Sequence, residues 1–104
     1  MRMMLQAVVD TEAGNEAIRS GAVAKLVEQM VEQLHPEALY FPAGDGQRAV
    51  MAVFDMTDTS QIPAIAEPLF LGANAKVTLT PCMNLDDLRK GLAALPPEVT
   101  SATA

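Results

Sequence analysis

The order of predicted secondary structure along the chain is the feature that most constrains its fold. Residues Met1–Val9 alternate as a strand does, and apolar residues recur at helical spacing over Asn15–Leu34. Two strands then flank a Gly44-Asp45-Gly46 turn, and a helix, a strand and a last short helix follow. The chain of 104 residues therefore reads β-α-β-β-α-β-α and is long enough to bury a core of its own.

Proline, glycine and capping residues set the boundaries of the later elements. Pro36 ends the first helix, and Pro42 places the following strand, Glu37–Pro42, at a sheet edge because proline cannot donate to a ladder. Pro68 predicts a kink or break near Ala64–Glu67 in the second helix. The first helix follows a turn at Thr11–Gly14 and has its cap at Asn15 or Thr11. The second helix has its cap at Asp58, Thr59 or Ser60 and stops at Gly72. A strand over Ala75–Met83 and a last helix capped by Asn84 follow. We expect one domain over residues 1–95 and a disordered tail over 96–104.

The strand Arg48–Met56 carries the strongest information about packing. Its residues from Ala49 to Phe54 are all apolar, so both of its faces are apolar. A strand of this kind is usually covered on both sides of the sheet.

Charge and composition narrow the classes of partner. The net charge is −6, and the 7 Lys and Arg residues are scattered, so we expect no nucleic-acid binding. No apolar run approaches the ~20 residues of a membrane span, so we expect a soluble, cytoplasmic protein with no membrane partner. Cys82 is the single cysteine, and Cys–His metal spacing is absent, so we expect neither a disulfide nor a metal site. We also expect no cofactor.

The β-α-β-β-α-β order resembles the ferredoxin-like plan, an α+β fold with a four-stranded antiparallel sheet whose first and third strands are central. Two helices cover only one face of such a sheet. The plan is similar to that of the dimeric α/β-barrel superfamily, which includes muconolactone-isomerase-like and antibiotic-monooxygenase-like proteins. Pro36–Phe41, Val53–Met56 and Ser60–Leu71 also resemble small uncharacterised bacterial proteins of this plan. The resemblance implies a homodimer that packs sheet against sheet, with an extra C-terminal helix.

Six residues are candidates to line a ligand site between the two sheets: Gln6, Tyr40, Met51, Asp55, Thr78 and Thr80. Asp55 ends the doubly apolar strand, where partial burial would raise its pKa and suit a proton acceptor. A turn residue that bonds nearby amides is the alternative for Asp55. Gln6, Thr78 and Thr80 either orient a small ligand or pair across strands.

Three further residues have structural interpretations. His35 is the only side chain with an ordinary pKa near neutrality, and its place before Pro36 favours a helix-capping role. Cys82 is expected to be a buried, inert thiol, and Glu67 to be a solvent-facing acid.

No catalytic constellation is present, and whether the protein is an enzyme stays open. The first hypothesis is a homodimeric structural or small-ligand-binding module. An alternative is a cofactor-independent isomerase or monooxygenase that acts on a small hydrophobic substrate. A third is an adaptor whose last helix docks onto a partner through a leucine stripe, which consists of Leu85, Leu88, Leu92 and Leu95.

Overall fold

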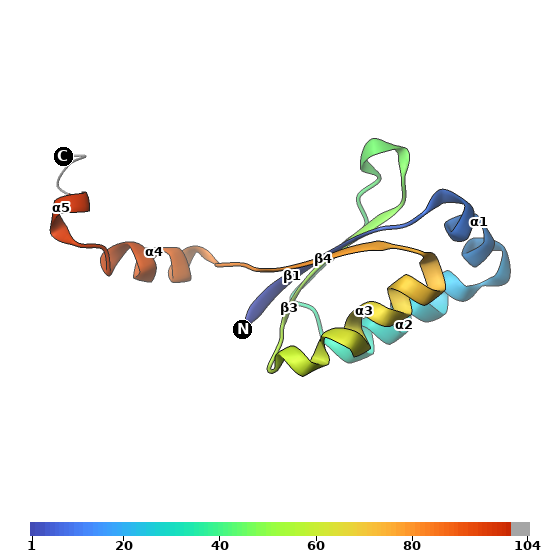
Figure 1. Cartoon of the computed structure of the whole chain (residues 1–104), viewed down its shortest axis with the longest axis horizontal. Coiled ribbons are helices and arrows are strands. Elements are labelled where there is room, and N and C mark those ends of the chain that lie inside the picture. The colour runs from blue at the N-terminus through green and yellow to red at the C-terminus, as the bar shows by residue number, and fades with distance from the viewer. Residues whose placement is uncertain (101–104) are drawn as a thin grey trace.

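A four-stranded antiparallel sheet with helices against one of its faces forms the body of the protein, and a C-terminal arm projects from it (Figure 1). This computed structural model describes residues 1–100. The strands are β1 (Arg2–Val8), β2 (Ala38–Tyr40), β3 (Ala49–Asp55) and β4 (Lys76–Pro81). The helices are α1 (Thr11–Ser20), α2 (Ala22–Leu34), α3 (Ile62–Ala73), α4 (Leu85–Ala93) and α5 (Pro97–Thr100), with 3-10 turns η1 (Gly44–Gly46) and η2 (Thr59–Gln61).

The strand order is β2-β3-β1-β4, which places the first and third strands at the centre and β2 at an edge. The α+β class, the antiparallel sheet and the edge position of the second strand are therefore confirmed. The arrangement is compatible with the ferredoxin-like plan. β2 is shorter than predicted, and Pro42 lies beyond its end.

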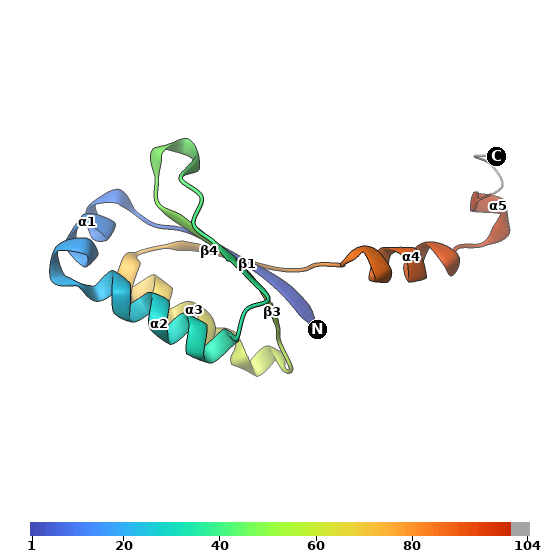
Figure 2. The ribbon, with the colours of Figure 1, turned by 180° about the vertical axis from the view of Figure 1, so that it is seen from behind.

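The core lies between the sheet and the pair α2 and α3 (Figure 2). Alternate residues of the central strands point into it, and Leu5 and Phe54 are its largest fully buried side chains. The helices contribute Met30 and Leu34 from α2, and Ile65 and Leu69 from α3. The core is therefore a single layer in which alternate strand residues pack against helix residues that recur every three or four positions.

The predicted helix over Asn15–Leu34 is two helices. Asp10 accepts a hydrogen bond from the Ala13 amide at 3.0 Å, so α1 begins at Thr11, and the predicted turn at Thr11–Gly14 is wrong. Gly21 ends α1 and begins α2 at a φ of 80°, a conformation that glycine adopts at little cost.

The second helix also differs from its prediction. α3 continues through Pro68 without the predicted break, and it passes Gly72 to end at Asn74, which has a φ of 45°. Ala64, whose carbonyl would accept the missing amide hydrogen of Pro68, is exposed, so water can satisfy that carbonyl. Asn74 tolerates the left-handed conformation, and its amide bonds to the carbonyls of Leu69 and Phe70.

The connection between β2 and β3 is a loop rather than the predicted tight hairpin turn. Gly44–Gly46 form the 3-10 turn η1, in which Asp45 and Gly46 have φ values of 58° and 72°. The loop rises from the sheet on the side opposite α2 and α3 (Figures 1 and 2).

The chain after β4 forms an arm that leaves the body. α4 and α5 lie apart from the sheet and from the other helices in both views (Figures 1 and 2). The predicted cap of α4 is confirmed, because Asn84 accepts a hydrogen bond from the Asp87 amide at 2.8 Å. The boundary between a domain over residues 1–95 and a disordered tail stays a prediction. α5 lies at the start of that tail, and residues 101–104 lie outside the described residues.

Candidate functional site

The sheet face away from α2 and α3, here called the open face, is the candidate site. Residues directly opposite each other on antiparallel strands share a face. Tyr40 pairs with Met51, Met51 with Gln6, and Gln6 with Thr78, so these four side chains form one row across all four strands. The neighbouring row consists of Ala38, Val53, Met4 and Thr80.

The centre of the open face is apolar. Met4, Met51 and Val53 are half-buried there, although no helix of the described chain covers them. The strand predicted to be apolar on both faces therefore buries Val50, Ala52 and Phe54 under the helices and presents its other face outward.

One end of the open face is hollowed. A depression of about 330 Å³ lies over Gln6, Val8, Met51 and Thr78, and Pro42 and Asp45 of the β2–β3 loop form part of its lining. A second depression of about 390 Å³ shares Val8, Asp45 and Lys76 with it. The loop that rises from the sheet thus forms one side of the depression.

Polar groups in the hollow are available for binding. The side chains of Gln6, Lys76 and Thr78 make no hydrogen bond to any described residue. They offer an amide, an ammonium and a hydroxyl beside the apolar Val8 and Met51. Asp45 stands in the same lining as Lys76, so the hollow carries one charge of each sign.

The structure brings together some of the predicted site residues. Gln6, Met51 and Thr78 line the hollow. Tyr40 is in the same row but on the edge strand, where it is 63% exposed. Thr80 is one row away, and Asp55 lies at the opposite end of the open face, across from Arg2.

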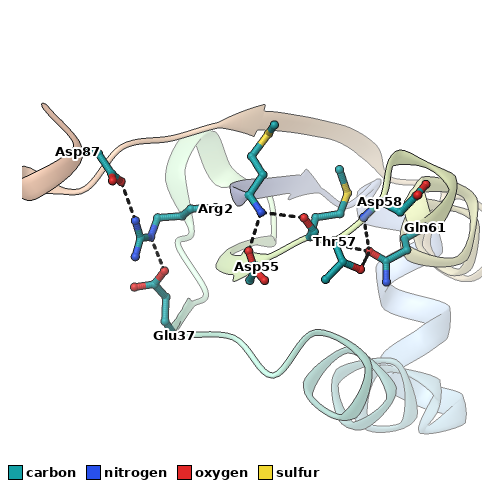
Figure 3. Close-up of polar contacts among 9 residues, drawn as sticks. Arg2, Glu37, Asp55, Thr57, Asp58, Gln61 and Asp87 are labelled. Carbon is teal, nitrogen blue, oxygen red and sulfur yellow. Dashed lines mark hydrogen bonds and ion pairs between the residues drawn. The ribbon is translucent and has the colours of Figure 1, made fainter. Parts of the chain in front are cut away.

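The prediction that Asp55 is partly buried is wrong. Its side chain is 73% exposed and forms an ion pair with the N-terminal ammonium at 2.7 Å (Figure 3). The N-terminal amine also donates to the Met56 carbonyl at 2.9 Å. β1 pairs with β3 in a register that puts the chain start beside the end of β3, and sequence spacing gives no sign of this neighbour.

The two charged residues of the lining, Lys76 and Asp45, were missed by sequence reasoning. Lys76 precedes Thr78 and Thr80 at the two-residue spacing of one strand face, and that spacing was a usable signal. The sequence holds no such signal for Asp45, because the position of Asp45 depends on the direction in which the β2–β3 loop rises.

The other singled-out residues are away from the hollow. His35 ends α2 through its backbone, with a φ of 45° and an amide bond to the Val31 carbonyl at 3.0 Å, while its side chain is exposed. Cys82 is half-buried rather than buried, and Glu67 is exposed as expected. Within residues 1–100 no cluster of His, Cys, Asp and Glu could hold a metal ion, and no helix is long and apolar enough to cross a membrane.

Comparison with known proteins adds no family to this description. No protein-family model matches the chain, and no curated protein matches it.

Proposed function

We propose that the protein is a homodimeric module that binds a small hydrophobic ligand between two open faces. The observation that carries the proposal is the apolar centre of the open face, where Met4, Met51 and Val53 have no cover from their own chain. The same face of a second copy would cover them, and a two-fold pairing of this kind is self-complementary. The resemblance to the dimeric α/β-barrel superfamily implies the same arrangement.

The hollow supports the ligand part of the proposal. Its volume of about 330 Å³ is at the lower end of the ~300–1,000 Å³ of small-molecule pockets. Val8 and Met51 would contact an apolar ligand body, while Gln6 and Thr78 would hydrogen-bond one polar group of it. A second copy over the open face would close the depression from solvent.

The catalytic alternative has less support. A cofactor-independent isomerase or monooxygenase needs a polar group tuned by its surroundings to accept a proton. Asp55, the candidate acceptor, is exposed and ion-paired, and it lies at the other end of the face from the hollow.

Sedimentation equilibrium tests the dimer. Met51→Lys places a charge at the centre of the open face, and Leu71→Lys places the same charge on α3, where the side chain is 85% exposed. We expect wild type and Leu71→Lys to sediment as dimers and Met51→Lys to sediment as a monomer. Circular dichroism should show that Met51→Lys is folded. A monomeric wild type at micromolar concentration would refute the dimer.

Fluorescence of anilinonaphthalene sulfonate, an amphiphilic probe, tests the hollow. Thr78→Phe would fill the depression. Thr59→Phe adds the same ring in the exposed turn η2, which follows the C-terminal end of β3 and is not part of the lining. The measurement is made at protein concentrations where sedimentation shows both variants in the wild-type oligomeric state. We expect the affinity of the protein for the probe to fall several-fold in Thr78→Phe and to stay unchanged in Thr59→Phe. Equal affinity in all three proteins would count against ligand binding at this site.

A further inference from the structure

Two charged side chains in the hollow have no partner in the described chain. Lys76 of β4 and Asp45 of the β2–β3 loop line both depressions at this end of the open face. Neither side chain forms an ion pair or a hydrogen bond with any residue between 1 and 100. The hollow therefore offers an ammonium and a carboxylate that are not already paired with each other.

The other charges near this end of the sheet are engaged elsewhere. Asp10 lines the second depression, but its carboxylate caps α1 through a hydrogen bond of 3.0 Å. Arg48 points to the helix side of the sheet, where its guanidinium donates to the Asn15 side chain at 3.0 Å. Among the described residues, Lys76 is thus the only cation that lines the two depressions, and Asp45 is the only acid that lines both.

An apolar surface lies directly beside the two charges. Val8 is paired with Lys76 on one side and with Ala49 on the other, so these three residues form one row on the open face. Met51 is in the next row and lines the hollow with them. A ligand that uses both features needs an apolar body against this surface and a charged end beside Lys76 and Asp45.

The two charges determine which end group fits. A carboxylate alone would be attracted by Lys76 but repelled by Asp45, and an ammonium alone would meet the opposite conflict. A net charge of −6 on the chain further disfavours a purely anionic ligand. A group that carries both charges is complementary to both side chains at once.

We propose that the ligand of the hollow is a zwitterion with an apolar body, of which an apolar α-amino acid is the simplest example. Its carboxylate pairs with Lys76, its ammonium pairs with Asp45, and its body packs on Val8 and Met51. This inference rests on the ligand part of the proposed function, because it names the chemical class that the same hollow binds. It does not depend on the dimer, since all four of these residues come from one chain.

Variants can separate the charge of Asp45 from its role in the turn. Its φ of 58° lies in the left-handed region, which aspartate and asparagine both tolerate. Asp45→Asn therefore keeps the turn and removes the charge, and Lys76→Met keeps an unbranched apolar stem and removes the ammonium. The matched controls are Lys25→Met on α2 and Glu67→Gln on α3, which remove the same charges at exposed positions outside the lining.

Titrations followed by amide chemical shifts test the proposal with three probes that share one branched apolar body. The probes are leucine, isocaproate, which lacks the ammonium, and isoamylamine, which lacks the carboxylate. We expect leucine to bind the wild type about threefold or more tightly than either analogue, as one additional ion pair near the surface would give. The largest shifts should lie in residues 45–51 and 76–78. Leucine that binds no more tightly than its analogues would overturn the inference.

The variants assign each charge of the ligand to one side chain. In Lys76→Met, leucine should lose its advantage over isoamylamine and keep its advantage over isocaproate. In Asp45→Asn, the advantage over isocaproate should vanish while the advantage over isoamylamine remains. Both advantages should persist in Lys25→Met and Glu67→Gln. Each result is a ratio between probes, so a general weakening of binding does not imitate it, and unchanged ratios in Lys76→Met or Asp45→Asn contradict the proposed pairing.

The possible results separate this inference from the proposed function. If Thr78→Phe weakens the binding of anilinonaphthalene sulfonate but leucine has no advantage over its analogues, ligand binding stands and the zwitterion is wrong. If no probe binds the wild type, the ligand part of the proposed function fails and the inference fails with it. A monomeric wild type that shows the expected ratios would refute the dimer and support the inference.

Discussion

Arg2 at the start of β1 donates a hydrogen bond from Nη1 to Oδ2 of Asp87 on α4 at 2.9 Å, and this ion pair joins the first strand to the arm (Figure 3). The same guanidinium bonds to Glu37 through Nε, and this contact raises the pKa of Arg2. Asp87 in turn accepts from the Asn84 amide at 3.1 Å and so completes the capping box of α4. One cation therefore connects the sheet, the entry to β2 and the first turn of the arm.

Replacing Arg2 with methionine should loosen the arm while leaving the body folded. The ion pairs of Arg2 lie at the surface, where such pairs contribute little to global stability. Their loss removes a direct tether between α4 and the sheet. We expect faster amide hydrogen exchange over residues 84–93 in Arg2→Met, with the core amides of β1 and β3 unchanged.

Arg19→Met is the matched control, because Arg19 lies near Glu16 at 3.9 Å on α1 and has no contact with the arm. Unchanged exchange over residues 84–93 in Arg2→Met would mean that another interaction holds the arm.

Asn84→Ala should unwind the start of α4. The side chain of Asn84 accepts from the Asp87 amide, and loss of such a cap costs about 1 kcal/mol of helix stability. Because α4 lies apart from α1, α2 and α3 (Figure 1), this cost falls on the arm alone. Carbon chemical shifts over residues 85–93 should move toward random-coil values, and the thermal midpoint of the body should stay within error. Helical shifts equal to those of the wild type would show that the cap is not needed.

The elements that were predicted well are those whose signal is local. Strand alternation in Met1–Val9 predicts which residues of β1 face the core, and Asn84 with its acidic neighbours marks the start of α4. β2 is at an edge as predicted, although Pro42, the residue used to predict this, lies beyond the end of the strand.

The errors come from competition between signals and from contacts distant in sequence. Asp10 and Asn15 both have capping side chains, and Asp10 prevails because it adds a further helical turn at Thr11. Pro68 is accommodated where the carbonyl it leaves unpaired can face water. The ion pair of Asp55 with the N-terminus depends on the β1–β3 register, which neither segment shows alone.

Gly21→Ala should destabilise the protein by roughly 1 kcal/mol. Gly21 has a φ of 80°, where a side chain is strained, although no atom lies within 4 Å of the position that a Cβ would take. The cost is therefore one of backbone conformation rather than of a clash. Gly91→Ala is the opposite case, since Gly91 lies inside α4 with open space around it, and alanine should favour the helix there by about 1 kcal/mol.

Urea unfolding followed by circular dichroism would compare the midpoint of Gly21→Ala with that of the wild type, and chemical shifts over α4 would report on Gly91→Ala. If Gly21→Ala were as stable as the wild type, residue 21 would not have a left-handed backbone conformation between α1 and α2.

Asp58 should make the stability of the protein depend on pH in acid solution. Its Oδ1 accepts from the Ser60 amide at 2.8 Å, and this hydrogen bond lowers the pKa of Asp58. A carboxyl whose pKa is lower in the folded state stabilises the fold above its unfolded pKa of about 3.9. That contribution is lost as the pH falls through the folded pKa.

Asp58→Asn keeps a side-chain acceptor at the cap but removes the titration. The thermal midpoint of the wild type should exceed that of Asp58→Asn by a constant amount from neutral pH to about 5, and the difference should shrink below about pH 4. Asp86→Asn is the control, because no hydrogen bond joins the Asp86 side chain to the described chain, and its midpoints should run parallel to those of the wild type. A wild-type advantage over Asp58→Asn that is independent of pH, or that grows in acid, would show that the carboxylate charge does not stabilise the entry to α3.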